Sequence, residues 1–213
     1  MTDRSLDTIE RHELCDLMTD LGPDAPTLLD PWTTRDLAAH LFIRENDLRA
    51  APGLVVPGAW GRFAERHRQA LTEQDYTTLL TTIRSGPPRG FFRVGWVRRG
   101  PNLNEFFVHH EDVRRANGLE PRTNTATLDD ALWRNVSLAP WFLARRLRGV
   151  GLELEWAGTT RVERARRGTP TARLTGQPGE LLLYLFGRQG AADVELSGSV
   201  EAVNALEQVR FGI

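Results

Sequence analysis

Residues 104–116 read NEFFVHHEDVRRA and hold the densest group of possible metal ligands in the chain. Glu105 and His109 are four residues apart, so on a helix their side chains lie about 40° apart and can reach one point. Asp112 falls on the same face one turn later, whereas His110 points about 100° away from His109. The neighbouring Phe and Val residues predict that this helix is buried on at least one side. Buried ionisable groups need a partner or a metal ion, so this face is the first candidate site.

A second helical pattern, at residues 33–50, supplies one more candidate ligand. Thr33 and Asp36 have the spacing of a capping-box variant, which marks the start of a helix. His40 follows between two leucines that are typical of a helical core. A histidine on such a face is usually a hydrogen-bonded core residue. Helical bundles nevertheless build metal sites from inward-facing side chains on neighbouring helices, so His40 becomes a candidate beside residues 104–116.

His40, Glu105 and His109 together form a possible set of three metal ligands. Two imidazoles and one carboxylate leave one position open for water or substrate, which is typical of catalytic zinc sites. Nickel and iron(II) also bind ligands of this kind. An acid and a histidine four residues apart also occur on solvated helix faces, so a surface pair is the alternative interpretation.

The rest of the chain up to residue 148 is predicted to form helices and loops. Apolar residues at helical spacing, separated by Gly and Pro, predict further helices at residues 4–21, 60–74, 76–84 and 128–148, the last with a kink at Pro140. The stretch FFRVGWVRRGPNLN, residues 91–104, has no clear helical period and is predicted to be a connection.

After Gly149 the pattern changes. Alternating apolar and polar residues predict strands at residues 151–158, 160–167, 171–176 and 191–198, and helical spacing predicts helices at 179–188 and 199–211. The sequence therefore predicts a mainly α protein with two domains. A helical domain at residues 1–148 carries the candidate metal site, and a small α+β domain follows at residues 149–213.

Composition narrows the chemistry that the 213 residues can perform. All 27 basic residues are arginine, which excludes a Schiff-base lysine and a P-loop lysine. The single cysteine excludes an internal disulfide framework and cysteine metal clusters. A net charge of −1 argues against a general nucleic-acid binder. The N-terminus lacks a signal peptide, and no apolar run approaches the ~18–20 residues of a membrane span, so we expect a soluble cytoplasmic protein.

The remaining histidines and the cysteine are weaker candidates. His12 and His67 lie in charged stretches and are predicted to be solvated. His110 is either a surface residue or a support for a metal ligand. Cys15 lies among leucines and is predicted to be a small buried hydrophobic residue, outside any site.

Several of these segments resemble one known family. HLFIRE (residues 40–45) after DPWTTRDLAA (30–39), followed by EFFVHHEDVRRA (105–116), is similar to the metal-binding domain of mycothiol-dependent maleylpyruvate isomerases. Those enzymes belong to the DinB-like four-helix-bundle superfamily. GPDAPTLLDPWTTRDLAAHL (22–41) is especially close to a mostly uncharacterised metal-binding subgroup, and GELLLYLFGRQG (179–190) resembles the helix and Gly-Arg turn of the α+β domain that often follows.

The resemblance implies roles for individual residues. The metal ligands of the family, usually of zinc, correspond to His40, Glu105 and His109. Asp112 matches an acid one turn beyond the second histidine, and it is expected to orient a ligand or to move a proton. Arg188 matches the arginine of the Gly-Arg turn, and it is expected to hold a substrate carboxylate.

The resemblance also implies an activity with mycothiol as the thiol co-substrate. In the isomerases the thiol adds to an activated double bond, the bond rotates and the thiol leaves. Residues 50–104 follow the isomerases less closely, so the substrate is left open and S-transfer to another electrophile is an equal possibility. The expected partners are a small thiol and an electrophilic substrate, with no nucleic acid or membrane, and the chain is a monomer or homodimer. A non-catalytic module that binds metal or a small ligand is the alternative.

Overall fold

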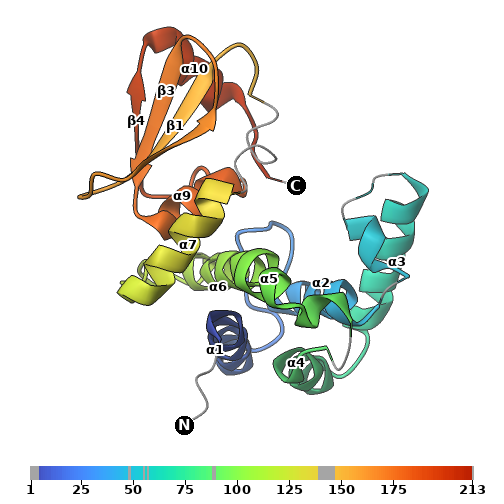
Figure 1. Cartoon of the computed structure of the whole chain (residues 1–213). Coiled ribbons are helices and arrows are strands. Elements are labelled where there is room, and N and C mark those ends of the chain that lie inside the picture. Colours follow the sequence, from blue (N-terminus) through green and yellow to red (C-terminus); the bar gives the residue numbers. More distant parts are fainter. Residues whose placement is uncertain are drawn as a thin grey trace. The chain divides into compact units, whose positions relative to one another are not determined.

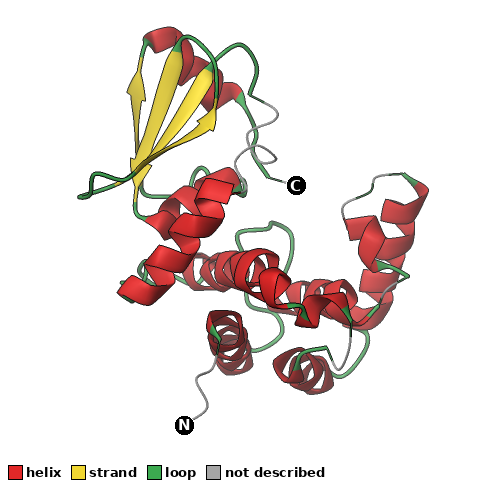
Figure 2. Cartoon of the chain, in the orientation of Figure 1, coloured by secondary structure: helices red, strands yellow, loops and turns green. Residues whose placement is uncertain are grey.

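The computed structural model describes residues 5–47, 49–54, 56, 58–87, 90–138 and 147–212 of the 213-residue chain. These residues are mainly helical and include a four-stranded sheet (Figures 1 and 2). Their contacts divide the chain into two compact units, Met1–Arg122 and Thr123–Ile213. The predicted mainly α class with a small α+β part is therefore confirmed.

The first unit consists of helices with a shared apolar core. Its longer helices are α1 (Leu6–Leu21), α2 (Thr34–Asn46), α3 (Ala59–Thr72), α4 (Tyr76–Ser85) and α6 (Leu103–Ala116). Helix α1 packs against α6 and α4, and α2 packs against α3 and α4. The core combines buried side chains of α1, α2, α4 and α6, among them Leu14, Met18, Leu37, Leu41, Leu79, Ile83 and Phe106. Burial of these residues fixes which faces of α2 and α6 are left for polar side chains.

Helix α2 begins at the capping box that the sequence predicts. The backbone N–H of Thr33 donates to Oδ2 of Asp36 at 2.9 Å, which satisfies a group left free by the helix start. The helix ends at Asn46, earlier than the predicted residue 50. Asp47 is extended, and its carboxylate accepts the N–H of Arg49 at 2.8 Å. This Asx-type turn competes with continued helix and ends it.

The connection predicted at residues 91–104 is wrong, because most of this stretch is helical. After a 3₁₀ turn, η2 (Phe91–Arg93), the short helix α5 (Gly95–Val97) runs through the π-helical segment η3 (Arg98–Asn102) into α6. Pro101 lies inside η3 and has no N–H, so an ordinary α-helical ladder cannot pass through it. The N–H of Leu103 instead reaches back to the carbonyl of Arg98, five residues earlier. The stretch without a clear helical period therefore contains a π-bulge.

The second unit begins with α7 (Ala126–Leu138), which packs against α9 (Pro178–Leu185). Because α7 makes its contacts there, the compact units divide after Arg122, whereas the change in sequence pattern predicts a boundary at residues 148–149. The predicted continuation of this helix through Pro140 falls on residues 139–146, which lie outside the described residues.

The sheet of the second unit has the strand order β2-β1-β3-β4. The strands are β1 (Gly151–Trp156), β2 (Val162–Arg166), β3 (Thr171–Gly176) and β4 (Val194–Gly198). Strand β1 is antiparallel to β2 and parallel to β3, and β3 is antiparallel to β4. Helices α9 and α10 (Val200–Gln208) contact β3 and β4. Leu152, Leu154 and Leu174 are fully buried, so the predicted alternation does give strands with one buried face.

Candidate metal centre

Helices α2 and α6 bring the three predicted ligands together. Nε2 of His40 on α2 lies 3.1 Å from Oε1 of Glu105 on α6. Nε2 of His109, one turn along α6, lies 3.3 Å from the same oxygen. The rings of His40 and His109 meet edge to face with their centroids 5.3 Å apart. Residues far apart in sequence therefore aim one donor atom each at a common point.

The donor atoms have the spacing that a small divalent ion requires. The three atoms all lie within 4.8 Å of one another. Bonds of about 2.0–2.1 Å to nitrogen and oxygen in a tetrahedral zinc site place neighbouring donor atoms roughly 3.3 Å apart. The two measured Nε2–Oε1 distances, 3.1 and 3.3 Å, match that edge length. Two of the three donor–donor distances therefore suit a four-coordinate ion with one open position, and the two histidine donor atoms lie within 4.8 Å of each other.

Asp112 supports His109 from behind. Its Oδ2 lies 2.9 Å from Nδ1 of His109, and its side chain is fully buried. A carboxylate at this nitrogen holds the proton on Nδ1 and leaves Nε2 free to bind a metal. The arrangement is the carboxylate–histidine pairing common around zinc ligands.

His40 is held differently. Its Nδ1 is buried without a hydrogen-bond partner among the described residues, so only Nε2 has a polar contact. Its ring lies against Trp32, with centroids 5.4 Å apart, and the guanidinium of Arg68 covers Trp32 at 4.8 Å. Ring packing rather than a second hydrogen bond therefore orients this ligand.

The charges of the site differ from those of the same groups in water. Burial alone would raise the pKa of Glu105, but the guanidinium of Arg44, with help from both histidines, holds that pKa well below its ordinary value. Burial lowers the pKa of His40. Burial also opposes charge on His109, yet its two carboxylate neighbours, Asp112 first, raise its pKa overall. The metal-free site thus favours the neutral form of His40 and the positively charged form of His109.

Two residues of this site were missed from sequence. Arg44 places its Nε 3.4 Å from Oε1 of Glu105, and Trp32 packs on His40. Arg44 follows His40 by four residues, so the same helical spacing that selected His109 could have found it. Trp32 precedes the helix in a loop, and no periodicity places a loop residue.

A second group of ligand-type residues lies on another face of α6. Glu10, Glu13 and His110 also bring donor atoms within 4.8 Å of one another. Here Arg122 already supplies the positive charge, with Nη2 3.0 Å from Oε2 of Glu10 and Nη1 3.5 Å from Glu13. Nε of Arg122 also donates to Glu111 at 2.7 Å. We therefore interpret this group as a buried ion-pair network and not as a metal site.

His110 belongs to that network, so the prediction of a surface residue is wrong, whereas a role in supporting a metal ligand stays a prediction. It is buried, and its Nδ1 lies 3.2 Å from Oε2 of Glu10. His12 and His67 are partly exposed, as predicted for solvated positions, although Nε2 of His67 lies 2.7 Å from Oδ2 of Asp47.

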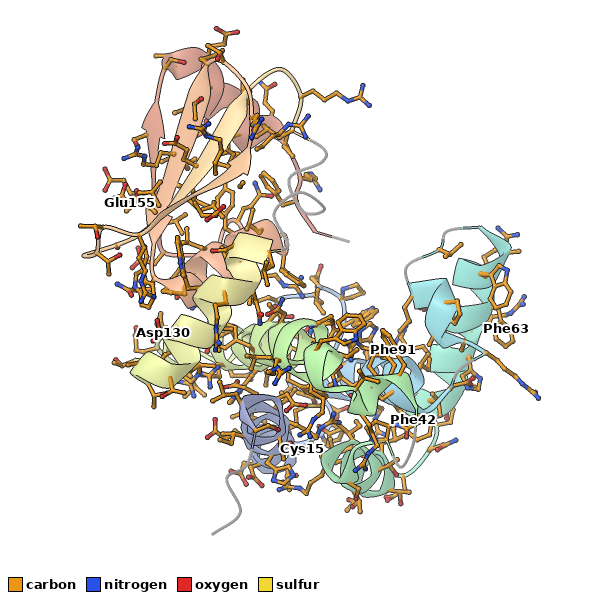
Figure 3. The ribbon with its side chains drawn as sticks, viewed as in Figure 1. Cys15, Phe42, Phe63, Phe91, Asp130 and Glu155 are labelled. Carbon is orange, nitrogen blue, oxygen red and sulfur yellow. The ribbon has the colours of Figure 1, made fainter. Side chains whose placement is uncertain are left out.

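Cys15 is buried in the core of the first unit, as predicted. It lies on α1 near α4, and its thiol donates to the carbonyl of Leu80 at 3.9 Å (Figure 3). Burial raises the pKa of the Cys15 thiol to about 11. A thiol in this state is neither a nucleophile nor a ready metal ligand.

Arg188 lies in the second unit, directly after the turn that ends α9. Gly187 has a φ of +88°, and a Cβ there would lie 2.8 Å from the carbonyl oxygen of Phe211, so only glycine fits. Nη1 of Arg188 donates to the carbonyl of Phe186 at 2.6 Å. Its contact with a substrate carboxylate stays a prediction.

Comparisons with models of protein families, with curated proteins and with solved structures gave no match to this chain. Among the helices that the structure describes, none has the length and apolar character needed to cross a membrane. The donor atoms of α2 and α6 are therefore the main guide to function.

Proposed function

We propose that the first unit is a divalent-metal-binding domain in which His40, Glu105 and His109 bind zinc. The observation that carries this proposal is the convergence of three donor atoms from two helices within 4.8 Å of one another, with both nitrogen–oxygen distances close to the edge length of a coordination tetrahedron. Nickel or iron(II) would be the next candidates for the same ligands.

We assign the domain to the DinB-like four-helix-bundle type, with α1, α2, α4 and α6 as the bundle. The shared apolar core of these four helices supports this assignment. So does the position of the ligands on two helices of the bundle, since bundles build metal sites from side chains on facing helices. Helix α3 packs against α2 and would be an addition to the bundle.

We further propose that the protein is an enzyme that uses a low-molecular-weight thiol such as mycothiol, either as an isomerase or as an S-transferase. A bound divalent ion lowers the pKa of a thiol and so supplies the reactive thiolate near neutral pH. The thiol must come from outside the chain, because Cys15 is buried with a pKa of about 11. In isomerisation the sulfur adds to an activated double bond and later leaves, whereas in transfer it stays bound to the electrophile.

Two further side chains, one in each unit, have separate tasks in this proposal. Asp112 holds the proton on Nδ1 of His109 and fixes the direction of that ring. Arg188 of the second unit would bind the carboxylate of the electrophile.

Elemental analysis of protein purified without a histidine tag tests the metal site. We expect one divalent ion per chain in the natural sequence and none in the variant His40→Ala. His67→Ala is the matched control, because His67 is a histidine of the same unit that pairs with Asp47 and not with the ligands. Equal metal content in all three proteins would refute the site.

Turnover assays test the activity. The zinc-loaded protein should convert maleylpyruvate or model electrophiles only when mycothiol or another small thiol is present. Metal binding without any thiol-dependent turnover would favour the alternative, a non-catalytic module that binds metal or a small ligand.

A further inference from the structure

Arg44 connects the metal ligands to the π-bulge that precedes α6. Its Nε lies 3.4 Å from Oε1 of Glu105. Its Nη1 donates to Oδ1 of Asn102 at 2.8 Å, and its Nη2 donates to the carbonyl of Pro101 at 3.3 Å. Its guanidinium also covers the ring of Phe92 at 4.6 Å. With these contacts and a side chain only 12% exposed, the charge of Arg44 is fixed in place beside the ligand carboxylate.

The aromatic contact continues toward the surface. Phe91, labelled in Figure 3, packs edge to face on Phe92 and on Trp96, with centroids 5.5 and 5.4 Å apart. Phe91 and Trp96 are both more than half exposed. The ring of Phe92 limits the access of water to the guanidinium of Arg44, and a charge shielded from water acts more strongly on its neighbours.

The fixed charges around the ligands do not cancel. A divalent ion, the carboxylates of Glu105 and Asp112, and the guanidinium of Arg44 together carry one net positive charge. Glu45 lies 3.8 Å from Nη1 of Arg44, but its charge is balanced by Arg11, whose Nη2 donates to Oε1 of Glu45 at 2.6 Å, so this pair leaves the sum unchanged. A net charge in a largely buried site is unfavourable, and one bound monoanion removes it.

We propose that Arg44 makes the open coordination position a binding site for monoanions, so that the thiol co-substrate binds there as its thiolate. This inference rests on the proposed metal site. Without Arg44 the ion and the two carboxylates would already be neutral, and a water molecule or another neutral ligand would suffice. Arg44 thus does not bind the ion. Its positive charge, fixed beside Glu105, favours an anionic fourth ligand on the ion.

Cobalt(II) in place of zinc gives the proposal a spectroscopic test. The metal-free protein is loaded with cobalt, and sodium azide and imidazole are titrated separately while the visible absorption of the cobalt is followed. We expect Arg44→Gln to weaken azide binding by roughly 10- to 100-fold, because one unit charge a few ångströms away has an effect of that order in a partly buried site. Imidazole is neutral, so its affinity should change less than about threefold on the same argument.

Two further variants separate charge from structure. Arg44→Lys keeps the charge but loses the fork that binds Asn102 and Pro101, and it should retain azide affinity within about threefold of the natural protein. Arg35→Gln is the matched control, since Arg35 lies on the same helix but donates to the carbonyls of Thr72 and Gln74. It should leave azide binding unchanged.

The outcomes distinguish this inference from the proposed function. Equal azide affinity in the natural protein and Arg44→Gln would overturn the inference, and so would an equal loss in Arg44→Lys and Arg44→Gln. Failure of the natural protein to bind cobalt or zinc would instead overturn the metal site itself.

Discussion

Two faces of helix α6 use the same residue types in different ways. Toward α2, Glu105 and His109 meet His40, and the guanidinium of Arg44 lies 3.4 Å from the shared oxygen of Glu105. Toward α1, His110 meets Glu10, and Arg122 lies among the carboxylates. His109 and His110 are adjacent in sequence but lie on different faces of α6. The face toward α2 has three converging donor atoms, and the face toward α1 has an ion-pair network.

The comparison shows that a cluster of histidines and acids is not by itself a metal site. Buried carboxylates need a positive partner in either case. On the α1 face that partner is Arg122, which is covalently part of the chain and cannot be exchanged. On the α2 face Arg44 lies beside Glu105, and Nε2 of both histidines faces the same carboxylate oxygen, which is where we propose that an exchangeable ion binds.

The largest expected effect is a loss of stability when the ion-pair network on the α1 face is broken. Arg122→Ala leaves the buried carboxylate of Glu10 without its guanidinium partner, and loss of one partner of a buried pair typically costs about 3–5 kcal/mol. We expect this loss in the free energy of unfolding of the metal-free protein, measured in urea. Arg161→Ala is the control, because Arg161 and Asp130 are both about half exposed and such pairs contribute ~0–1 kcal/mol. Similar small losses in both variants would contradict the assignment of Arg122 as the central cation.

The next effect compares the adjacent histidines directly. His109→Ala removes a proposed ligand, and we expect zinc affinity to fall by more than the roughly 10- to 100-fold that is typical when only an outer partner is lost. His110→Ala should leave zinc affinity unchanged, since its partner is Glu10. Competition with a chromophoric chelator measures both values. A greater loss in His110→Ala than in His109→Ala would reverse the roles assigned to the two faces.

A smaller effect is expected behind the ligand. Asp112→Asn keeps the shape of the side chain but weakens its hold on Nδ1 of His109. Outer partners of this kind contribute about 10- to 100-fold to metal affinity, so zinc should bind more weakly by that factor. The same chelator competition measures it, and unchanged affinity would remove Asp112 from the site.

The smallest effect is the pH dependence of the metal-free protein. The pKa of His109 is raised in the fold, so its contribution to stability is complete below the ordinary histidine pKa of about 6.5 and is lost as the pH rises through the higher folded value. The pKa of His40 is lowered, so its unfavourable protonation acts below about 6.5 instead.

Urea unfolding at a series of pH values measures this dependence. Above pH ~6.5 the free energy of unfolding should fall by at most about 1.4 kcal/mol per pH unit, because one proton is involved. In the variant His109→Gln, the free energy of unfolding should no longer fall with pH in this window. A free energy of unfolding that instead rises with pH in that window would contradict the protonated state assigned to His109.

The predictions from sequence were most successful where local periodicity decides the structure. The spacing of Glu105 and His109 and the capping box of Thr33 and Asp36 are both properties of a few consecutive residues, and both are present in the fold. The alternation of residues 151–156 likewise gives β1. The prediction failed at residues 91–104, because the π-helical segment interrupts the ordinary helical spacing and leaves no clear period in the sequence.

By itself, then, the sequence determined the helical spacing of the ligands, the strands of the small sheet and the absence of lysine and disulfide chemistry. These follow from composition and from repeats of a few residues, which each segment carries alone. Only the tertiary structure decided that Arg122 fills one cluster, that Arg44 lies beside Glu105, and that α7 packs with the second unit. Those facts depend on contacts between segments distant in sequence. No local pattern reports which arginine reaches which of two similar faces, or how close it comes to the donor atoms.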